Sequence, residues 1–303
     1  MAQSFLQPFL FLFIIVLANL LKRGGVFKES EGKVLSQITL NITLPAAIIA
    51  GFDSIQMDYA LLIFILMGIA VNMIQMAIAY LLMHKENNFL KSYALLNGAT
   101  YNIGNFSFPF IQTLFGAPGL VIAALFDLGN ALMTTGFTYS VAASVAGGQR
   151  PNIADLIKKL FSSVPFVAYL FMLTLSMLGL HLPVFFSEWM QSIGKANPII
   201  AMLMIGIMLD IHFEKGWLKH TIKMLGVRYL GASVFSLAIY QFTDYSHMIK
   251  VTLILLFFSP ISTMAAAFTQ KCTNNGKLSS FTTSISVVVS IVCYMVLVPL
   301  LGV

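Results

Sequence analysis

The sequence predicts an all-α polytopic membrane protein with ten transmembrane helices in two inverted five-helix repeats. Three observations predict this fold: an apolar composition, ten apolar segments of helical length, and prolines that recur at one offset. Of the 303 residues, 58% are hydrophobic and 9% are charged, and the mean hydropathy is +0.89. Soluble domains carry about 25% charged residues, so this composition excludes a soluble enzyme, a disordered protein and a nucleic-acid-binding protein.

Ten apolar segments follow one another with short connections, and each approaches the length of about 20 residues that a membrane span needs. The segments are Ser4–Leu21, Val34–Phe52, Tyr59–Met83, Leu90–Leu114, Ala117–Ala146, Leu156–Leu180, Trp189–Ile211, Leu218–Phe242, His247–Gln270 and Leu278–Leu300. No long polar stretch separates them, so the sequence predicts one membrane domain and no soluble domain.

The basic residues predict one orientation for these segments. Of the 17 lysines and arginines, fourteen lie in the odd-numbered connections, whereas Lys250 alone lies in an even-numbered one. Because basic residues gather in cytoplasmic loops, we expect the odd connections in the cytoplasm and both the N-terminus and the C-terminus outside. The expected location is the plasma membrane, crossed many times.

Two pairs of prolines recur at nearly the same offset. Pro45 in the second segment and Pro198 in the seventh are 153 positions apart, and Pro109 in the fourth and Pro260 in the ninth are 151 apart. Because a repeat of five spans has an odd number of crossings, the second repeat starts on the opposite side of the membrane and is inverted relative to the first. Inverted repeats are a common plan of secondary transporters. We therefore expect one repeat at 1–147 and a second, inverted repeat at 148–303.

Polar residues beside Pro109 and Pro260 make unbroken helices unfavourable in the fourth and ninth segments. Proline cannot continue a helix from the preceding turn, and unpaired backbone groups are costly in lipid. We expect two broken helices whose half-helix N-termini attract anions, with Ser259 as the cap and Pro260 as the first residue of the second half-helix. The alternative is a pair of kinked helices whose polar residues bond neighbouring helices. The candidate substrate-binding residues are Asn102, Asn105, Ser107, Pro109, Ser259, Pro260, Ser262 and Thr263.

The segments NITLPAAIIAGF, NIGNFSFPFIQTLFGAPG and IAMLMIGIMLD, with the paired prolines, resemble the auxin efflux carrier family. That family includes plant PIN-type auxin exporters and bacterial malate and malonate permeases, and the resemblance extends over the whole chain. It implies ten helices in two inverted repeats, with broken fourth and ninth helices that cross near the middle. It also implies a mobile crossover domain that carries a small organic anion against a scaffold domain.

The family's spacing from an asparagine to a proline seven residues later is matched by Asn102 and Pro109, whereas Ser107 stands where many members have glycine. The chain has no long central loop of the kind found in plant exporters, so it resembles the compact bacterial members more closely.

Asp127 lies about a third of the way along the fifth segment, and Asn130 follows on the same helix face. A carboxylate inside a membrane span is costly and is a functional hypothesis by default. We expect Asp127, supported by Asn130, to couple transport to protons or sodium. The structural alternative is a neutral aspartic acid that bonds a neighbouring helix.

Two basic residues fall within or at the edge of apolar segments. Lys195 is expected to extend its ammonium group to the membrane interface, with a counter-ion for an anionic substrate as the alternative. Arg228 is expected to reach the cytoplasmic headgroups, with a role in substrate binding as the alternative. The two cysteines, Cys272 and Cys293, predict neither a disulfide framework nor a metal site. The sequence contains no nucleotide-binding or metalloprotease motif, so we expect no cofactor and no enzymatic activity.

These patterns together predict a secondary active transporter, or permease, that moves a small organic anion by alternating access, with a carboxylate as the expected class. A cation/proton antiporter of similar architecture and a membrane ligand sensor that does not transport are the two alternatives. The expected partners are the anion, the lipid bilayer, and protons or sodium as coupling ions. A homodimer is a candidate assembly.

Overall fold

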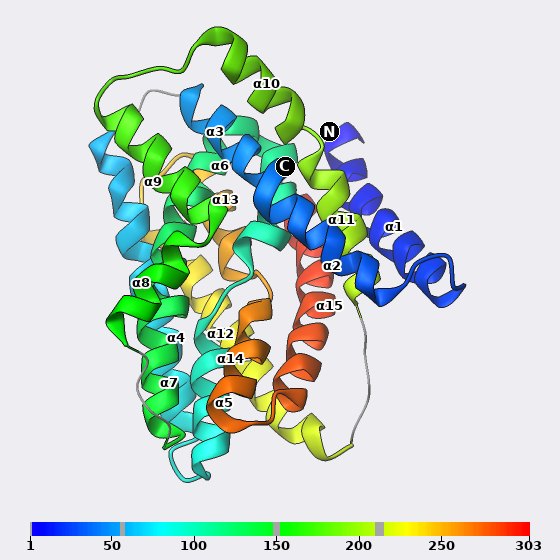
Figure 1. Ribbon diagram of the computed structural model, residues 1–303, viewed down its shortest axis with the longest axis vertical. Helices are drawn as coiled ribbons and strands as arrows, with labels where there is room; N and C mark the ends of the chain where they lie inside the picture. The colour runs from blue at the N-terminus through cyan, green and yellow to red at the C-terminus, as the bar shows by residue number, and fades with distance from the viewer. Residues whose placement is uncertain (1, 55–57, 148–151, 210–214) are drawn as a thin grey trace.

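The computed structural model describes residues 2–54, 58–147, 152–209 and 215–303, and these residues are predominantly helical (Figure 1). The first half of the chain contains α1 (Ala2–Arg23), α2 (Glu29–Ile38), η1 (Thr39–Thr43), α3 (Leu44–Asp53), η2 (Tyr59–Leu62), α4 (Ile63–Leu82), α5 (Asn88–Ala99), η3 (Ile103–Ser107), α6 (Phe108–Ala131), η4 (Leu132–Thr138) and α7 (Tyr139–Val145). The second half contains α8 (Ile153–Phe161), α9 (Val164–Met177), α10 (Val184–Gly194), α11 (Asn197–Met208), η5 (Lys215–Trp217), α12 (Leu218–Phe242), α13 (His247–Phe257), α14 (Thr263–Thr273) and α15 (Lys277–Leu300).

Within the described residues, five helical segments are long and apolar enough to cross a membrane. They are Ser30–Asp53, Tyr59–Leu82, Ile103–Val145, Leu218–Phe242 and Lys277–Leu300. α8 and α9 give a sixth candidate if the pair, which bends by 79°, is taken as one span. The predicted all-helical, membrane-type architecture is confirmed, whereas the count of ten spans stays a prediction. The end of the expected segment Trp189–Ile211 lies outside the described residues.

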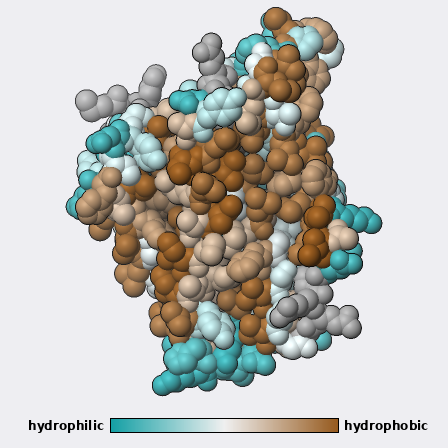
Figure 2. Space-filling model, turned by 90° about the vertical axis from the view of Figure 1, so that its left-hand side faces the viewer, coloured by the Kyte–Doolittle hydropathy of each residue, from teal (hydrophilic) through white to brown (hydrophobic). Residues whose placement is uncertain are grey.

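Apolar side chains cover the middle of the face shown in Figure 2, and hydrophilic residues gather at its lower end. Large hydrophobic residues are exposed on helices that lie far apart in the sequence, including Phe13 at 61%, Leu66 at 61% and Leu230 at 71%. A soluble protein rarely exposes so much contiguous apolar surface. Lipid hydrocarbon is a suitable solvent for it, so the surface agrees with the composition.

The helices pack in two groups. The first helix group consists of α1, α2, α3, α9, α10 and α11, and the second helix group consists of α4–α7 and α12–α15. α6 contacts both groups through α3, α4, α11 and α13, and α8 packs on η4 and α9. Each group takes helices from both halves of the chain.

Two segments of the second helix group are interrupted by extended backbone. The first break lies between α5 and η3 at residues 100–102, and the second between α13 and α14 at residues 258–262. The breaks meet in an antiparallel bridge between Tyr101 and Ile261. The Asn102 amide donates to the Pro260 carbonyl at 2.9 Å, and the Ser262 amide donates to the Thr100 carbonyl at 3.4 Å. Backbone groups that leave the helices are thus paired inside the protein, as a low-dielectric environment requires.

The second half-helix starts later than the sequence predicted. α14 begins at Thr263, and the Ser262 hydroxyl caps it by accepting from the Met264 amide at 3.3 Å. The expectation that Ser259 is the cap and Pro260 the first helical residue is therefore wrong. The physical reason is the bridge between the breaks, which holds Pro260 in extended backbone with its carbonyl bonded to Asn102.

A glycine separates the expected fourth and fifth segments. Gly116 has a φ of +59° and a ψ of −144°, and Pro118 follows it. This backbone conformation favours glycine because a side chain would be strained there. The turn therefore falls between Leu114 and Ala117, where the sequence placed the boundary.

Candidate functional site

A cavity of about 200 Å³ lies where the two breaks meet. Tyr101–Asn105 line it from the first break, and Ser262–Met264 line it from the second. Six of the ten residues predicted from the sequence lie on its wall: Asn102, Asn105, Asp127, Asn130, Ser262 and Thr263. Both broken segments therefore contribute to one cavity, together with the helix that carries Asp127.

Asn130 joins Asp127 to the first break. Its Nδ2 donates to the Tyr101 carbonyl at 3.1 Å and to Asp127 Oδ1 at 2.8 Å. Its Oδ1 accepts from the Tyr101 amide at 3.2 Å and from the Thr134 hydroxyl at 3.3 Å. Asn130 thus pairs both backbone groups of a residue that lies outside any helix, which buried backbone requires. Asp127 and Asn130 share one helix face, as expected, and a direct hydrogen bond joins their side chains.

Asp127 also connects the two helix groups. Tyr169 on α9 donates its hydroxyl to Asp127 Oδ2 at 3.0 Å, and its ring meets that of Phe108 edge to face. The half-buried carboxylate therefore accepts hydrogen bonds from both groups while facing the cavity. Tyr169 is not identifiable as a site residue from the sequence, because only tertiary packing brings α9 to α6. The one signal in the sequence is a polar aromatic residue within an apolar segment.

Asn102 and Asn105 offer polar groups to a bound molecule. Asn105 Oδ1 is buried without a hydrogen-bond partner, which is unfavourable unless a ligand or a water pairs it. Asn102 lines the main cavity and also a second cavity of about 90 Å³, and Thr263 lies on both walls as well. These two residues therefore stand between the two cavities.

Four of the predicted residues lie off the cavity wall: Ser107, Pro109, Ser259 and Pro260. The hydroxyls of Ser107 and Ser259 are 2.5 Å apart, and Tyr294 donates to Ser107 Oγ at 2.8 Å. Pro109 lies in the first turn of α6. Ser107, Ser259 and Pro260 join the broken segments through hydrogen bonds, and none of the four residues lines the cavity.

Arg228 on α12 is a central residue that the sequence analysis misinterpreted. It is 0% exposed, so the expectation that it reaches the headgroups is wrong. Its guanidinium donates to the Thr100 carbonyl at 2.8 Å, to the Ser259 carbonyl at 2.7 and 3.1 Å, and to the Pro260 carbonyl at 2.9 Å. It also lies 4.0 Å from the centroid of the Tyr101 ring. Arg228 therefore joins both breaks. Lys195 is exposed, and its position at the membrane interface stays a prediction.

Lys159 is a charged residue on the cavity wall, opposite in sign to Asp127. Its ammonium lies 3.5 Å from the ring centroid of Phe268 and 5.3 Å from that of Tyr139, and the two rings stack at 4.3 Å. Such cation–π contacts hold an ammonium group near the aromatic faces. In the sequence Lys159 is one of the basic residues that set the orientation, and the bend between α8 and α9 brings it to the cavity.

The cavity wall also includes the N-terminal end of α14, from its cap Ser262 to Met264. A helix N-terminus carries a partial charge of about +0.5. The helix end and Lys159 therefore favour a negatively charged group in the cavity, while Asp127 favours a proton or a positive group. Among the described residues, no group of three or more histidine, cysteine, aspartate or glutamate side chains is arranged to hold a metal ion.

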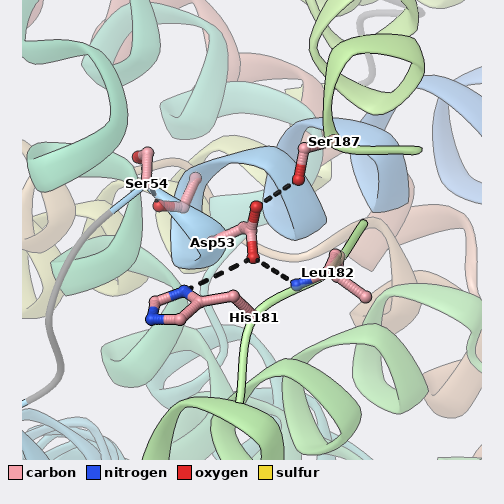
Figure 3. Close-up of polar contacts among 6 residues, drawn as sticks. Asp53, Ser54, His181, Leu182 and Ser187 are labelled. Carbon is pink, nitrogen blue, oxygen red and sulfur yellow. Dashed lines mark hydrogen bonds and ion pairs between the residues drawn. The ribbon is translucent and has the colours of Figure 1, made fainter. Parts of the chain in front are cut away.

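A second internal carboxylate has a structural role at the end of α3 (Figure 3). Asp53 accepts hydrogen bonds from the Leu182 amide at 3.0 Å and from the Ser187 hydroxyl, and His181 Nδ1 lies 3.9 Å from its Oδ1. These partners come from the connection between α9 and α10 and from the start of α10. Asp53 therefore fixes that connection on α3 and does not belong to the cavity wall.

No known family model matches the chain. The chain is 25% identical over 225 residues to an uncharacterized transporter of Methanothermobacter thermautotrophicus, and the match covers 72% of this chain and 72% of the relative. The protein is thus an all-helical, membrane-type chain with a distant similarity to a transporter.

Proposed function

We propose that the protein is a secondary active transporter of a small organic anion, with a carboxylate as the expected class, that works by alternating access. The observation that carries the proposal is the cavity at which both broken segments meet, with the α14 N-terminus and Lys159 on its wall. Half-helix N-termini point at anionic substrate groups in many secondary transporters. The similarity to an uncharacterized transporter supports the same conclusion. In this proposal the protein is a permease of the plasma membrane and not an enzyme.

We also propose the ten-helix, inverted-repeat arrangement of the auxin efflux carrier family. Two contacts support it, because they join positions at the same offset as the paired prolines. Ser107 and Ser259 are 152 positions apart and share a hydrogen bond. Gln75 and Arg228 are 153 apart, and Gln75 Nε2 donates to the Arg228 carbonyl at 3.2 Å. Residues related by a two-fold axis meet where both lie near that axis, so such contacts favour two interlocked, inverted repeats.

In the proposed complex the substrate carboxylate lies beside Asn102 and the N-terminus of α14. The side-chain amide of Asn102 and the hydroxyl of Thr263 donate hydrogen bonds to it, and the helix end adds a favourable dipole. Lys159 lies at the same cavity and raises the local concentration of anions by attraction. The second cavity, on the other side of Asn102 and Thr263, gives room for the remainder of the molecule.

Asp127 is the proposed coupling group. It lies between the two helix groups, so a movement of one group against the other changes both its exposure and its bond to Tyr169. A buried carboxylate favours its neutral form, and water favours the charged form, so such a movement takes up a proton on one side and releases it on the other. A cation/proton antiporter would use the same residue, but the cavity wall combines this carboxylate with a lysine and a helix N-terminus, which favours an anion.

The test begins with thermal-shift measurements on the purified protein against dicarboxylates and aromatic acids. Liposomes that contain the protein and are preloaded with the unlabelled stabilising acid should then accumulate the labelled acid transiently, because a carrier exchanges the two. Binding without such counterflow would identify a sensor and contradict the proposal. Stabilisation by inorganic cations alone, with no effect of any acid, would favour the antiporter.

A further inference from the structure

Arg228 carries a buried charge, and its hydrogen bonds go to backbone carbonyls. Among the described residues no carboxylate forms an ion pair with it, although it is fully enclosed. An isolated charge in a low-dielectric interior is strongly unfavourable. Four of its N–H groups donate to backbone carbonyls of Thr100, Ser259 and Pro260, so backbone dipoles compensate the guanidinium, and the Tyr101 ring adds a cation–π contact.

These carbonyls follow directly on the C-terminal ends of two helices. Thr100 is the residue after α5, and Ser259 and Pro260 follow the end of α13. A helix C-terminus carries a partial charge of about −0.5, so two such ends together offset about one positive charge. Arg228 therefore fits the two ends in charge as well as in hydrogen-bonding geometry.

Unwound carbonyls and half-helix C-termini are also the groups that coordinate sodium in secondary transporters with broken helices. We propose that Arg228 is a tethered internal cation that occupies this position, so that the two breaks are joined without a bound metal ion. The guanidinium supplies the positive charge that a coupling cation would otherwise bring, and it uses the carbonyls that such a cation would need.

This proposal has a consequence for ion coupling, which rests on the proposed transport function. Because Arg228 occupies the crossing of the breaks, sodium does not bind there, and the proton at Asp127 is the coupling ion. The occupancy of the position by Arg228 is testable without any transported substrate. A failure of the transport assay and a failure of the Arg228 proposal are thus distinguishable.

The experiment measures thermal unfolding of the purified protein in sodium chloride, guanidinium chloride at low concentration, and choline chloride, at equal ionic strength. The wild-type protein should unfold at the same temperature in sodium and in choline. Arg228→Met keeps a long side chain but removes the charge, so it should lower the unfolding temperature and create an empty cation position. Sodium or guanidinium should then raise the unfolding temperature of this variant by several degrees over choline, because binding to the folded state stabilises it.

Two controls separate a tethered cation from a general effect of charge. Arg228→Lys keeps a positive charge and should respond to sodium much less than Arg228→Met does. Lys195→Met removes an exposed charge and should match the wild type in all three salts. A selective rise of the wild-type unfolding temperature in sodium would overturn the proposal, whether or not Arg228→Met folds. So would a folded Arg228→Met protein that responds to neither sodium nor guanidinium.

Discussion

Asn102 combines two roles in one residue. Its backbone amide donates to the Pro260 carbonyl and so helps to join the two breaks, while its side chain lies on the walls of both cavities. The backbone role survives any substitution except proline, because it does not depend on the side chain. A change of the side chain therefore tests binding without removing the contact that holds the breaks together.

Asn102→Ala should weaken substrate binding by about tenfold or more, since a hydrogen bond to a charged group contributes about 1.5–3 kcal/mol. The unfolding temperature should stay close to that of the wild type. A ligand titration followed by thermal shift or calorimetry measures both. Asn41→Ala, at an exposed asparagine that does not line the cavity, is the matched control. Equal affinities for a folded Asn102→Ala protein and the wild type would mean that the substrate binds elsewhere.

Asp127→Asn should abolish uphill accumulation driven by a pH gradient and retain exchange. The amide resembles the protonated acid in shape and hydrogen bonding, yet it cannot release a proton. Liposome uptake with and without a pH gradient measures the difference. Asp58→Asn removes an exposed carboxylate and should leave both activities intact. If Asp127→Asn still accumulates substrate with an unaltered pH dependence, the carboxylate is structural.

The sequence predicted those site residues that are unusual within their own apolar segment. Asn102, Asn105, Asp127 and Asn130 stand out because polar residues in apolar segments are few and have a cost. Tyr169 and Lys159 do not stand out in the sequence, since tyrosine and lysine are common at membrane interfaces. Only tertiary packing brings these two residues to the cavity. The role of Arg228 was misjudged because its partners are backbone carbonyls, which no residue pattern reveals.

Two glycines allow the helices α4 and α6 to cross with their backbones in contact. A Cβ atom on Gly68 would lie 2.3 Å from the Phe126 carbonyl oxygen, and one on Gly129 would lie 2.2 Å from the Ile65 carbonyl oxygen. Small residues at such crossings are typical of membrane helices, where close packing supports association. This crossing positions Asp127 and Asn130, which lie on α6 beside Gly129.

Gly129→Ala should destabilise the protein by about 1–3 kcal/mol, because the added methyl group forces the two backbones apart. Thermal unfolding in detergent measures the loss. Gly226→Ala is the matched control, since a Cβ atom there has no neighbour within 4 Å. This control should be neutral or slightly stabilising, as alanine forms helices better than glycine. Equal stabilities of the two variants would contradict the close crossing.

The sequence predicted that the two segments are broken, but it did not predict the residue at which the second half-helix begins. Proline and serine mark each broken segment, and asparagine accompanies them in the first, because none of these residues favours a helix in lipid. The start of α14 at Thr263 depends on the bridge between Tyr101 and Ile261, which is a contact between distant parts of the chain. Local sequence rules place Pro260 in a first helical turn, and the long-range pairing prevents it.

The two termini and two of the connections lie at opposite ends of the structure in Figure 1. The N-terminal end of α1 and the C-terminal end of α15 lie toward the upper end in Figure 1, as does the connection between α9 and α10. The connection between α4 and α5 lies at the lower end. An even number of crossings brings both termini to one side of the membrane. Three expected spans separate the α4–α5 connection from the α9–α10 connection, which places these two connections on opposite sides. From the distribution of basic residues we expect the lower end to face the cytoplasm.

Cysteine labelling tests this orientation directly. In a background in which Cys272 and Cys293 are replaced by serine, Lys85→Cys should react with a membrane-impermeant maleimide only when the cytoplasmic side is accessible. Leu180→Cys should react only from outside. Both positions are exposed, so a lack of reaction reflects the membrane rather than burial. Labelling of Lys85→Cys from outside and of Leu180→Cys from inside would invert the orientation. Labelling of both from the same side would contradict the three spans expected between them, and with them the ten-span arrangement.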